Sequence, residues 1–110
     1  MDNCIFCKII NGDFNTDFVY EDEKVAAFND INPQAPVHIL FVPKVHVASL
    51  NELEDTSIIK SIYDAIKKVA EEKGIKDYRV VLNTGKEAGQ EVMHIHFHMI
   101  SGRKLNWPPG

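Results

Sequence analysis

Basic charge, long apolar segments and cysteine are all scarce in this sequence. The 110 residues carry 12 lysines and arginines against 16 aspartates and glutamates, a formal net charge of −4. This balance leaves no basic footprint for nucleic acid, so we expect no nucleic-acid partner, although local donors still suffice for a small anion. No apolar segment is long enough to span a membrane, and residues 1–4 do not begin a basic and then apolar leader. We therefore expect a cytoplasmic protein that binds no membrane.

The rest of the composition is typical of one globular domain, because 45% of the residues are hydrophobic and 25% are charged. A chain of this length buries one core but not two, so we expect a single domain over residues 1–110. Hydrophobic periodicity predicts helices at residues 5–14 and 55–73 and strands at residues 18–21, 25–28, 37–43, 78–83 and 94–100. Asp55 is expected to cap the long helix, and Gly12 and Gly74 to end the two helices. The predicted fold class is α+β, an antiparallel sheet of about five strands with one long helix and a short N-terminal helix.

Three histidines stand at alternate positions near the C-terminus. His94, His96 and His98 are separated by apolar residues, which predicts a strand that carries the three rings on one face, about 6.6 Å apart. Like charges this close lower one another's pKa, which favours a neutral, nucleophilic ring near pH 7. A solvated polar face, a zinc site built on His-x-His and nucleophilic catalysis all fit this pattern.

Cys4 and Cys7 form the only Cys-x-x-Cys pair. A structural disulfide is disfavoured in a reducing compartment, so the pair indicates metal or redox chemistry, or two inert thiols. Zinc needs two further ligands, and histidine is the richest source of them in this chain.

Other polar residues occupy positions where a structural and a functional role are both open. His38 lies in the apolar strand predicted at residues 37–43 and needs a hydrogen-bond partner there. Asp30 begins a turn-rich segment with two prolines, where a carboxylate commonly serves as a turn or cap residue. The loop at residues 84–90 contains two glycines, which allow backbone N–H groups to approach an anion closely.

Several of these stretches together resemble the histidine triad family. Residues 94–100 match its motif His-x-His-x-His-x-x, in which x is apolar, and residues 4–10, 28–38 and 42–46 resemble the family in the same order. The tail at residues 102–110 is similar to the Hint branch in particular. The resemblance therefore covers essentially the whole chain.

This resemblance implies an enzyme of the bacterial purine nucleoside phosphoramidase type. Such an enzyme cleaves the P–N bond of nucleoside 5′-phosphoramidates, of the adenosine phosphoramidate or aminoacyl-adenylate kind, and releases a nucleoside monophosphate. His96 is implied to attack phosphorus and form a nucleotidyl-histidine. His98 is implied to stabilise the phosphoryl oxygens, the backbone near His94 to fix the tautomer of His96, and His38 to support the triad.

The family also implies a nucleotide site. Asp30 would accept hydrogen bonds from the two ribose hydroxyls, as a carboxylate can. The base would lie among Ile5, Phe6, Ile9 and Phe14, and the α-phosphate against Asn83, Gly89, Gln90 and the backbone after them at Glu91 and Val92. Phe28 and Ile31 are implied as further nucleotide-binding residues. Animal Hint proteins carry serine where this chain has Glu91, and an ionised glutamate repels phosphate. That departure means that Glu91 either faces away or meets a cationic leaving group.

The remaining implications concern metal and partners. In some bacterial members a structural zinc is held by residues that correspond to Cys4, Cys7, His46 and His94, and no cofactor is needed for catalysis. The family further implies purine nucleotides (AMP, GMP and their phosphoramidates) as ligands, and a homodimer with one continuous sheet in which the tail with Trp107 reaches the partner's active site. Two alternatives remain open, a zinc-dependent hydrolase with the triad as ligands and a nucleotide-binding scaffold protein.

Overall fold

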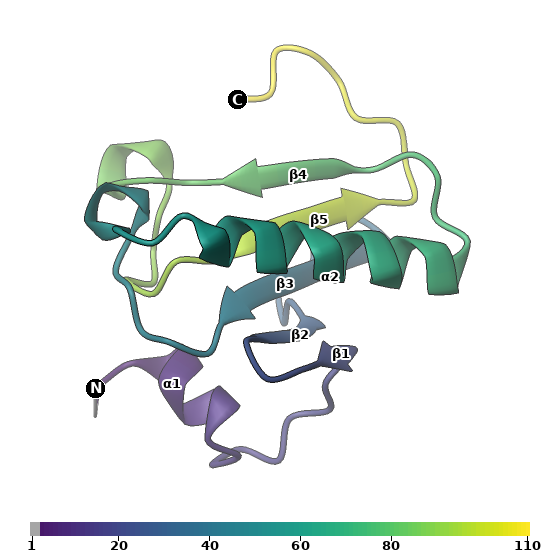
Figure 1. The fold of residues 1–110 in the computed structure, drawn as a ribbon. Coiled ribbons are helices and arrows are strands. Elements are labelled where there is room, and N and C mark those ends of the chain that lie inside the picture. Colours follow the sequence, from purple (N-terminus) through teal and green to yellow (C-terminus); the bar gives the residue numbers. More distant parts are fainter. Residues whose placement is uncertain (1–2) are drawn as a thin grey trace.

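Five antiparallel strands in one sheet organise the chain (Figure 1). The computed structural model describes residues 3–110; residues 1 and 2, the start of the N-terminal segment considered above, lie outside the described residues. The elements in chain order are α1 (Ile5–Ile10), β1 (Tyr20–Glu21), β2 (Val25–Asn29), β3 (Val37–Pro43), the 3-10 turn η1 (Leu50–Glu52), α2 (Ser57–Lys73), β4 (Arg79–Leu82), the 3-10 turn η2 (Lys86–Ala88) and β5 (Phe97–Ser101).

The strand order is β1-β2-β3-β5-β4, and all neighbouring strands are antiparallel. This architecture, one sheet with a long and a short helix, confirms the predicted α+β fold. β3 lies at the centre, pairing Phe28 of β2 with Leu40 and Leu40 in turn with His98 of β5. β4 forms one edge of the sheet, and the C-terminal tail runs beyond it (Figure 1).

The two helices cover opposite faces of this sheet. α2 carries Ile62, Ile66 and Val69 at three- and four-residue spacing, and these pack with Phe41 and Phe97 in the larger core. Its remaining positions are mostly polar, and within residues 3–110 neither helix combines the length and apolar character needed to cross a bilayer.

α1 supplies the second, smaller core. Its Phe6 packs with Phe28, Leu40 and Val42, which point to the face of the sheet opposite α2. Because side chains alternate along a strand, His98, which pairs with Leu40, lies on this same face. The histidines therefore face the side that α1 covers.

The triad strand is shorter than predicted, because β5 begins only at Phe97 and His94 and His96 precede it. The β3–β5 ladder ends at the pair Phe41 and Phe97, and beyond it the Pro43 carbonyl accepts from the His94 ring. The backbone N–H of Ile95 donates to Val47. The expected uniform spacing of 6.6 Å is therefore wrong, and the rings of His96 and His98 lie 5.1 Å apart, centroid to centroid.

The start of α2 also differs from the prediction by one residue. Thr56 is the N-cap residue and its side chain makes no capping bond. Asp55 nevertheless supplies the missing acceptor, since its Oδ1 accepts from the N–H of Ser57 at 3.0 Å and from its hydroxyl at 2.6 Å. Gly74 ends the helix with a left-handed φ of 67°, as predicted.

Candidate functional site

Four histidine rings adjoin one another on the α1 side of the sheet. His38 comes from β3, His98 from β5, and His94 and His96 from the irregular segment before it. The ring centroids of His38 and His98 are 5.1 Å apart, as are those of His96 and His98. The structure thus brings together all four residues that the sequence singled out as catalytic candidates.

His96 is held in one tautomer by the backbone. Its Nδ1 lies 2.8 Å from the carbonyl oxygen of His94, which can only accept, so Nδ1 carries the proton and the neutral ring keeps a lone pair on Nε2. Within residues 3–110 no hydrogen bond reaches this Nε2, and no side-chain nitrogen sealed from solvent lacks a partner. The ring keeps 7% of its surface exposed, which places Nε2 at its accessible edge.

Two successive hydrogen bonds, from Gln34 to His38 and from His38 to His98, set the tautomer of His98. The backbone N–H of Gln34 donates to Nδ1 of His38 at 3.0 Å, so the proton of neutral His38 is on Nε2. That Nε2 lies 2.8 Å from Nδ1 of His98, which must then accept. His98 therefore carries its own proton on Nε2. It is a hydrogen-bond donor next to His96, whose Nε2 has a free lone pair.

The cluster is held neutral mainly by burial. Burial lowers the pKa of His94, and it lowers the pKa of His96 against the opposing charges of Asp30 and Glu91. For His98, burial together with the neighbouring His96 and His38 rings lowers the pKa to about 4. At neutral pH the triad rings are uncharged, which leaves a nitrogen lone pair available for nucleophilic attack.

Asp30 lies at the end of β2, next to this cluster. Its Oδ2 is 3.4 Å from Nε2 of His38, and its Oδ1 accepts from the backbone N–H of Asn32 at 2.8 Å. The carboxylate therefore closes its own turn, as the structural interpretation expects, while its second oxygen faces the histidines. Binding to ribose remains a prediction.

The apolar residues predicted to bind the nucleotide divide into two groups. Phe6 and Phe28 are buried, with ring centroids 5.6 Å apart, and Ile9 and Val92 pack against the same cluster. The Phe6 ring also lies 5.0 Å from the His96 ring. The structure therefore places these apolar residues beside the candidate nucleophile.

The other three apolar residues predicted to bind the nucleotide are exposed instead of buried beside His96. Ile5 is 45% exposed, Phe14 54% and Ile31 101%. Ile31 is fully open to solvent, so it makes no enclosed wall by itself. A nucleobase role for these three residues stays a prediction from the family.

Gln90 cross-links the loop before the triad to neighbouring backbone groups. Its Oε1 accepts from the N–H of Gly85 at 2.9 Å, and its Nε2 donates to the carbonyls of Ala48 and Val92 at 2.7 and 3.1 Å. Its backbone N–H donates to Gly85 as well. All its N–H groups have protein acceptors in this structure. A role of Gln90 at the phosphate stays a prediction from the family.

The loop itself bends as the two glycines suggested. Gly85 and Gly89 have left-handed φ values of 91° and 100°, which favour glycine. A Cβ added at Gly89 would meet the Asn83 amide at 3.5 Å, so these two predicted cradle residues adjoin. Glu91 is exposed. Whether a phosphate is held by this loop remains a prediction.

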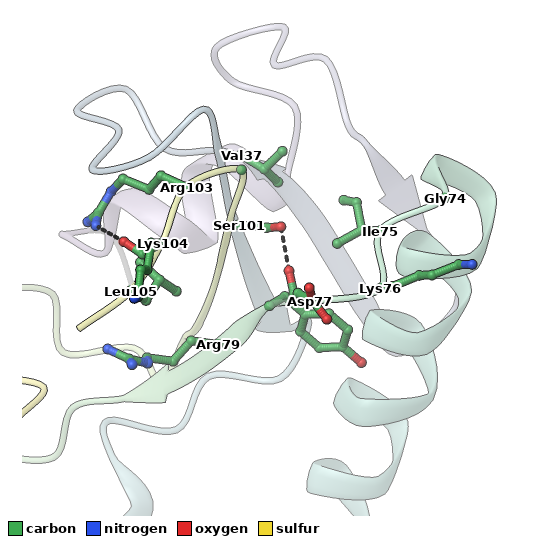
Figure 2. Close-up of a pocket in the computed structure, with 12 residues that line it drawn as sticks. Val37, Gly74, Ile75, Lys76, Asp77, Arg79, Ser101, Arg103, Lys104 and Leu105 are labelled. Carbon is green, nitrogen blue, oxygen red and sulfur yellow. Dashed lines mark hydrogen bonds between the residues drawn. The ribbon is translucent and has the colours of Figure 1, made fainter. Parts of the chain in front are cut away.

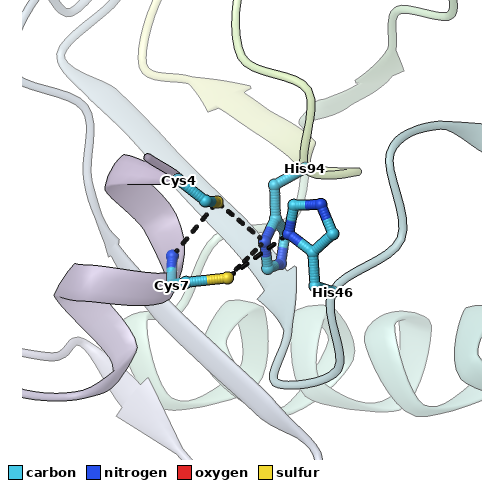
Figure 3. A group of neighbouring side chains, drawn as sticks. All are labelled: Cys4, Cys7, His46 and His94. Carbon is cyan, nitrogen blue, oxygen red and sulfur yellow. Dashed lines mark hydrogen bonds between the residues drawn. The ribbon is translucent and has the colours of Figure 1, made fainter. Parts of the chain in front are cut away.

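Cys4, Cys7, His46 and His94 converge from α1, the segment after β3 and the triad segment (Figure 3). Their ligand atoms all lie within 4.8 Å of one another. Nδ1 of His94 is 3.3 Å from the sulfur of Cys4 and 3.5 Å from that of Cys7. Nδ1 of His46 is 3.3 Å from the sulfur of Cys7. Zinc bonded tetrahedrally to sulfur and nitrogen would separate them by about 3.5 Å, so the donor set fits zinc.

The orientation of His94 supports the same conclusion. Its Nε2 donates to the Pro43 carbonyl at 2.9 Å, which leaves the lone pair of Nδ1 directed at the two thiols. Burial and the neighbouring Cys4 raise the pKa of the Cys7 thiol, so a metal must displace protons to bind.

A second group of three potential ligands, Asp30, His38 and His98, is better described as hydrogen-bonded. Two histidine nitrogens on one tetrahedral zinc ion lie about 3.3 Å apart. The nitrogens of His38 and His98 are only 2.8 Å apart, a hydrogen-bond distance. Within residues 3–110 the three triad rings are not found together in one group of potential metal ligands.

A separate groove of about 830 Å³ lies beside the end of α2 and the start of β4 (Figure 2). Four basic residues line it, namely Lys76, Arg79, Arg103 and Lys104. Arg79 donates to the Asn106 carbonyl and Arg103 to that of Gln34, both at 3.0 Å, so both guanidinium groups hold the chain at the tail. The groove shares no residue with the histidine cluster, and no motif predicted it, because its basic residues meet only in the fold.

Comparison with known proteins agrees with these observations. The family model described as "Scavenger mRNA decapping enzyme C-term binding" matches residues 3–106. A 14 kDa zinc-binding protein of Zea mays is 49% identical over 96% of this chain and 87% of its own length, and the adenylylsulfatase HINT1 of Arabidopsis thaliana is 44% identical over 96% and 76%. The crystal structure of a HIT family hydrolase from Legionella pneumophila is 44% identical, with a TM-score of 0.93, over 98% of this chain and all of that one. The chain therefore belongs to the histidine triad (HIT) family.

Proposed function

We propose that the protein hydrolyses nucleoside 5′-phosphoramidates, such as adenosine 5′-phosphoramidate, through a nucleotide bound covalently to His96. The observation that carries this proposal is the 2.8 Å bond from Nδ1 of His96 to the His94 carbonyl, which leaves a lone pair on Nε2. Two relatives support a hydrolase acting on nucleotides, since one is named an adenylylsulfatase and another a HIT family hydrolase.

The first step forms one bond and breaks another. Nε2 of His96 attacks the α-phosphorus, the P–N bond breaks, and the amine leaves with the bonding electrons and takes up a proton. Water then attacks the nucleotidyl-histidine, releases the nucleoside monophosphate and restores the imidazole. Two easier displacements replace one difficult displacement.

His98 acts on charge that builds on phosphorus during these steps. The relay from His38 leaves the proton of His98 on Nε2, where it donates to a phosphoryl oxygen. A preorganised donor of this kind contributes about 10²- to 10³-fold to the rate, because it strengthens as negative charge develops. The low pKa of His98 keeps it a neutral donor, not a cation, across the physiological range.

The Cys4, Cys7, His46 and His94 cluster is the proposed zinc site, in keeping with the zinc-binding relative from Zea mays. When bound there, zinc supplies a structural cross-link between α1, the segment after β3 and the triad segment. The catalytic steps themselves use nitrogen and backbone groups of this chain.

Purine nucleotides such as AMP and GMP, together with their phosphoramidates, are the proposed ligands, and the cytoplasm is the proposed location. We also propose a homodimer through β4, whose outer edge has no strand partner within residues 3–110. Trp107 is 81% exposed and is thereby free to reach the partner's site. Light scattering of the purified chain tests this assembly: a dimer is expected, and a monomer at micromolar concentration refutes it.

The function is tested by comparing the wild type with His96→Ala. The substrates are adenosine 5′-phosphoramidate and adenosine 5′-phosphosulfate, the second because of the adenylylsulfatase relative. We expect His96→Ala to lose turnover while it keeps AMP binding by calorimetry, and an exposed control on α2, Lys67→Ala, to keep both. Full activity in His96→Ala contradicts the proposal.

The same assay separates the alternatives. A scaffold protein binds AMP but releases no product from either substrate. A zinc hydrolase loses all activity as soon as a chelator removes the metal, whereas the nucleotidyl-histidine enzyme retains part of it.

A further inference from the structure

We propose that the metal-ligand cluster, Cys4, Cys7, His46 and His94, also orients the nucleophile. When these four residues hold a metal ion they fix α1 and His94, and through Phe6 and the His94 carbonyl they hold the His96 ring in one orientation and one tautomer. The inference rests on the proposed function only in taking His96 as the nucleophile. Phe6 is then a positioning residue for the reaction, acting through His96.

The first connection runs through His94, which is completely buried. Its Nδ1 faces the two sulfurs at 3.3 and 3.5 Å, and its Nε2 is bonded to Pro43 at 2.9 Å. The carbonyl of the same residue accepts from Nδ1 of His96 at 2.8 Å. His94 therefore carries both a metal-ligand nitrogen and the backbone acceptor that sets the tautomer of His96, so one residue joins the cluster to the nucleophile.

The second connection runs through α1. Phe6 stands between the two cysteine ligands in the sequence, is 6% exposed, and meets the His96 ring edge-on at 5.0 Å and the His94 ring at 6.0 Å. α1 has only 6 residues, and isolated helices shorter than about 12 residues are marginal in water. Its position must come from tertiary anchors, which include the burial of Phe6, the packing of Ile9 and Ile10 against the same core, and the two thiol ligands.

The anchors act at the beginning of the helix. Cys4 is the N-cap residue, and its sulfur accepts from the N–H of Cys7 at 3.3 Å. The sulfur of Cys7 meets Nδ1 of His46 at 3.3 Å. Loss of the metal leaves these contacts as weak thiol hydrogen bonds, so α1 loosens and Phe6 no longer restrains the His96 ring. Disturbing groups that orient a site residue typically costs 10- to 100-fold in activity, about the loss expected here.

The experiment follows the His96 ring directly. Protein with ¹⁵N-labelled histidine is compared in its zinc-loaded form, after a chelator has removed zinc, and after zinc has been restored. In zinc-loaded protein we expect one set of His96 ring signals with the proton on Nδ1. In stripped protein we expect signals averaged between tautomers, and the original spectrum on reloading.

Variants locate the effect, with rapid-quench mass spectrometry measuring how fast the nucleotidyl-histidine forms from adenosine 5′-phosphoramidate. His46→Ala removes a ligand and leaves His94, Phe6 and His96 intact, so we expect the stripped spectrum and a slower adduct. Phe6→Leu keeps the metal and an apolar side chain, so we expect full zinc content with a slower adduct, and His96 ring signals averaged between tautomers even in the absence of nucleotide. Lys8→Ala, on the same helix and outside both connections, is the matched control and should match the wild type.

The outcomes distinguish this inference from the proposed function. Identical His96 signals and adduct rates in loaded and stripped wild type overturn the inference. A His96 spectrum that responds to zinc in a protein that forms no adduct supports the positioning role and refutes the proposed function. If His46→Ala fails to fold, the reversible wild-type series decides, because the dispersion of the backbone amide signals in the stripped protein shows whether the fold survived stripping.

Discussion

Acidification tests how the histidine cluster is kept neutral. Burial, with the rings of His96 and His38 beside it, lowers the pKa of His98 to about 4, against an ordinary value of about 6.5. As the pH falls below 6.5, the unfolded chain takes up a proton at this position while the folded protein resists until about pH 4. The folded state is therefore destabilised across this window and is unaffected by His98 above it.

The magnitude follows from the size of the shift. A difference of about 2.5 pKa units corresponds to about 3 kcal/mol in the free energy of unfolding. His98 is only partly buried, so solvent screens part of this, and we expect about 1–2 kcal/mol. At pH 5.5 about 3% of the folded His98 rings should be protonated, against about 91% for an unperturbed histidine.

Two measurements check this prediction. A ¹⁵N-histidine titration in excess zinc should show His98 still neutral at pH 5.5. Urea unfolding at pH 7 and pH 5 should show that the wild type loses about 1–2 kcal/mol more than His98→Gln, in which that proton uptake is absent. The reasoning is refuted if His98 titrates near 6.5, or if the two proteins lose equal stability on acidification.

Three further predictions concern the loop, the metal cluster and the core. Gln90→Ala should lower the free energy of unfolding by about 1–3 kcal/mol, because buried partners of its amide are left unpaired; unchanged urea stability would contradict this. We expect the wild type to bind one zinc ion per chain and Cys7→Ser to bind zinc more weakly, as followed by metal analysis and chelator competition, and equal affinity would argue against the cluster. Ile62→Ala, at a fully buried position of α2, should cost about 2–5 kcal/mol in urea unfolding, and a loss below about 1 kcal/mol would show that α2 packs more loosely than described.

Regular elements of this fold could be predicted from local sequence. The bounds of β3 match its run from Val37 to Pro43, which is apolar apart from His38, because a central strand buried on both faces favours apolar residues and ends where proline cannot donate. α2 was predicted from the spacing of Ile62, Ile66 and Val69, and its end from Gly74. In these elements the hydrophobic pattern needed for burial is visible within a short stretch of the sequence.

The sequence was enough to predict which residues come together in the candidate site, but not their geometry or tautomers. The alternation of histidines predicted a strand through His94, yet contacts with Pro43 and Val47, distant in sequence, interrupt it. The tautomer of His98 depends on the backbone N–H of Gln34 acting through His38, which no residue pattern encodes. The chemistry of the side chains was enough to predict which residues form the site. Which nitrogen of each histidine carries the proton depends on contacts with backbone groups distant in sequence.

The most direct test of the account is the capture of the nucleotidyl-histidine. Wild-type protein is mixed with adenosine 5′-phosphoramidate, quenched without acid after milliseconds, digested and analysed by mass spectrometry. The account predicts one AMP residue bound to the peptide that contains His96, forming and decaying fast enough to support turnover, and no adduct in His96→Ala. Turnover without this adduct, or an adduct on another residue that persists in His96→Ala, would contradict the central claim.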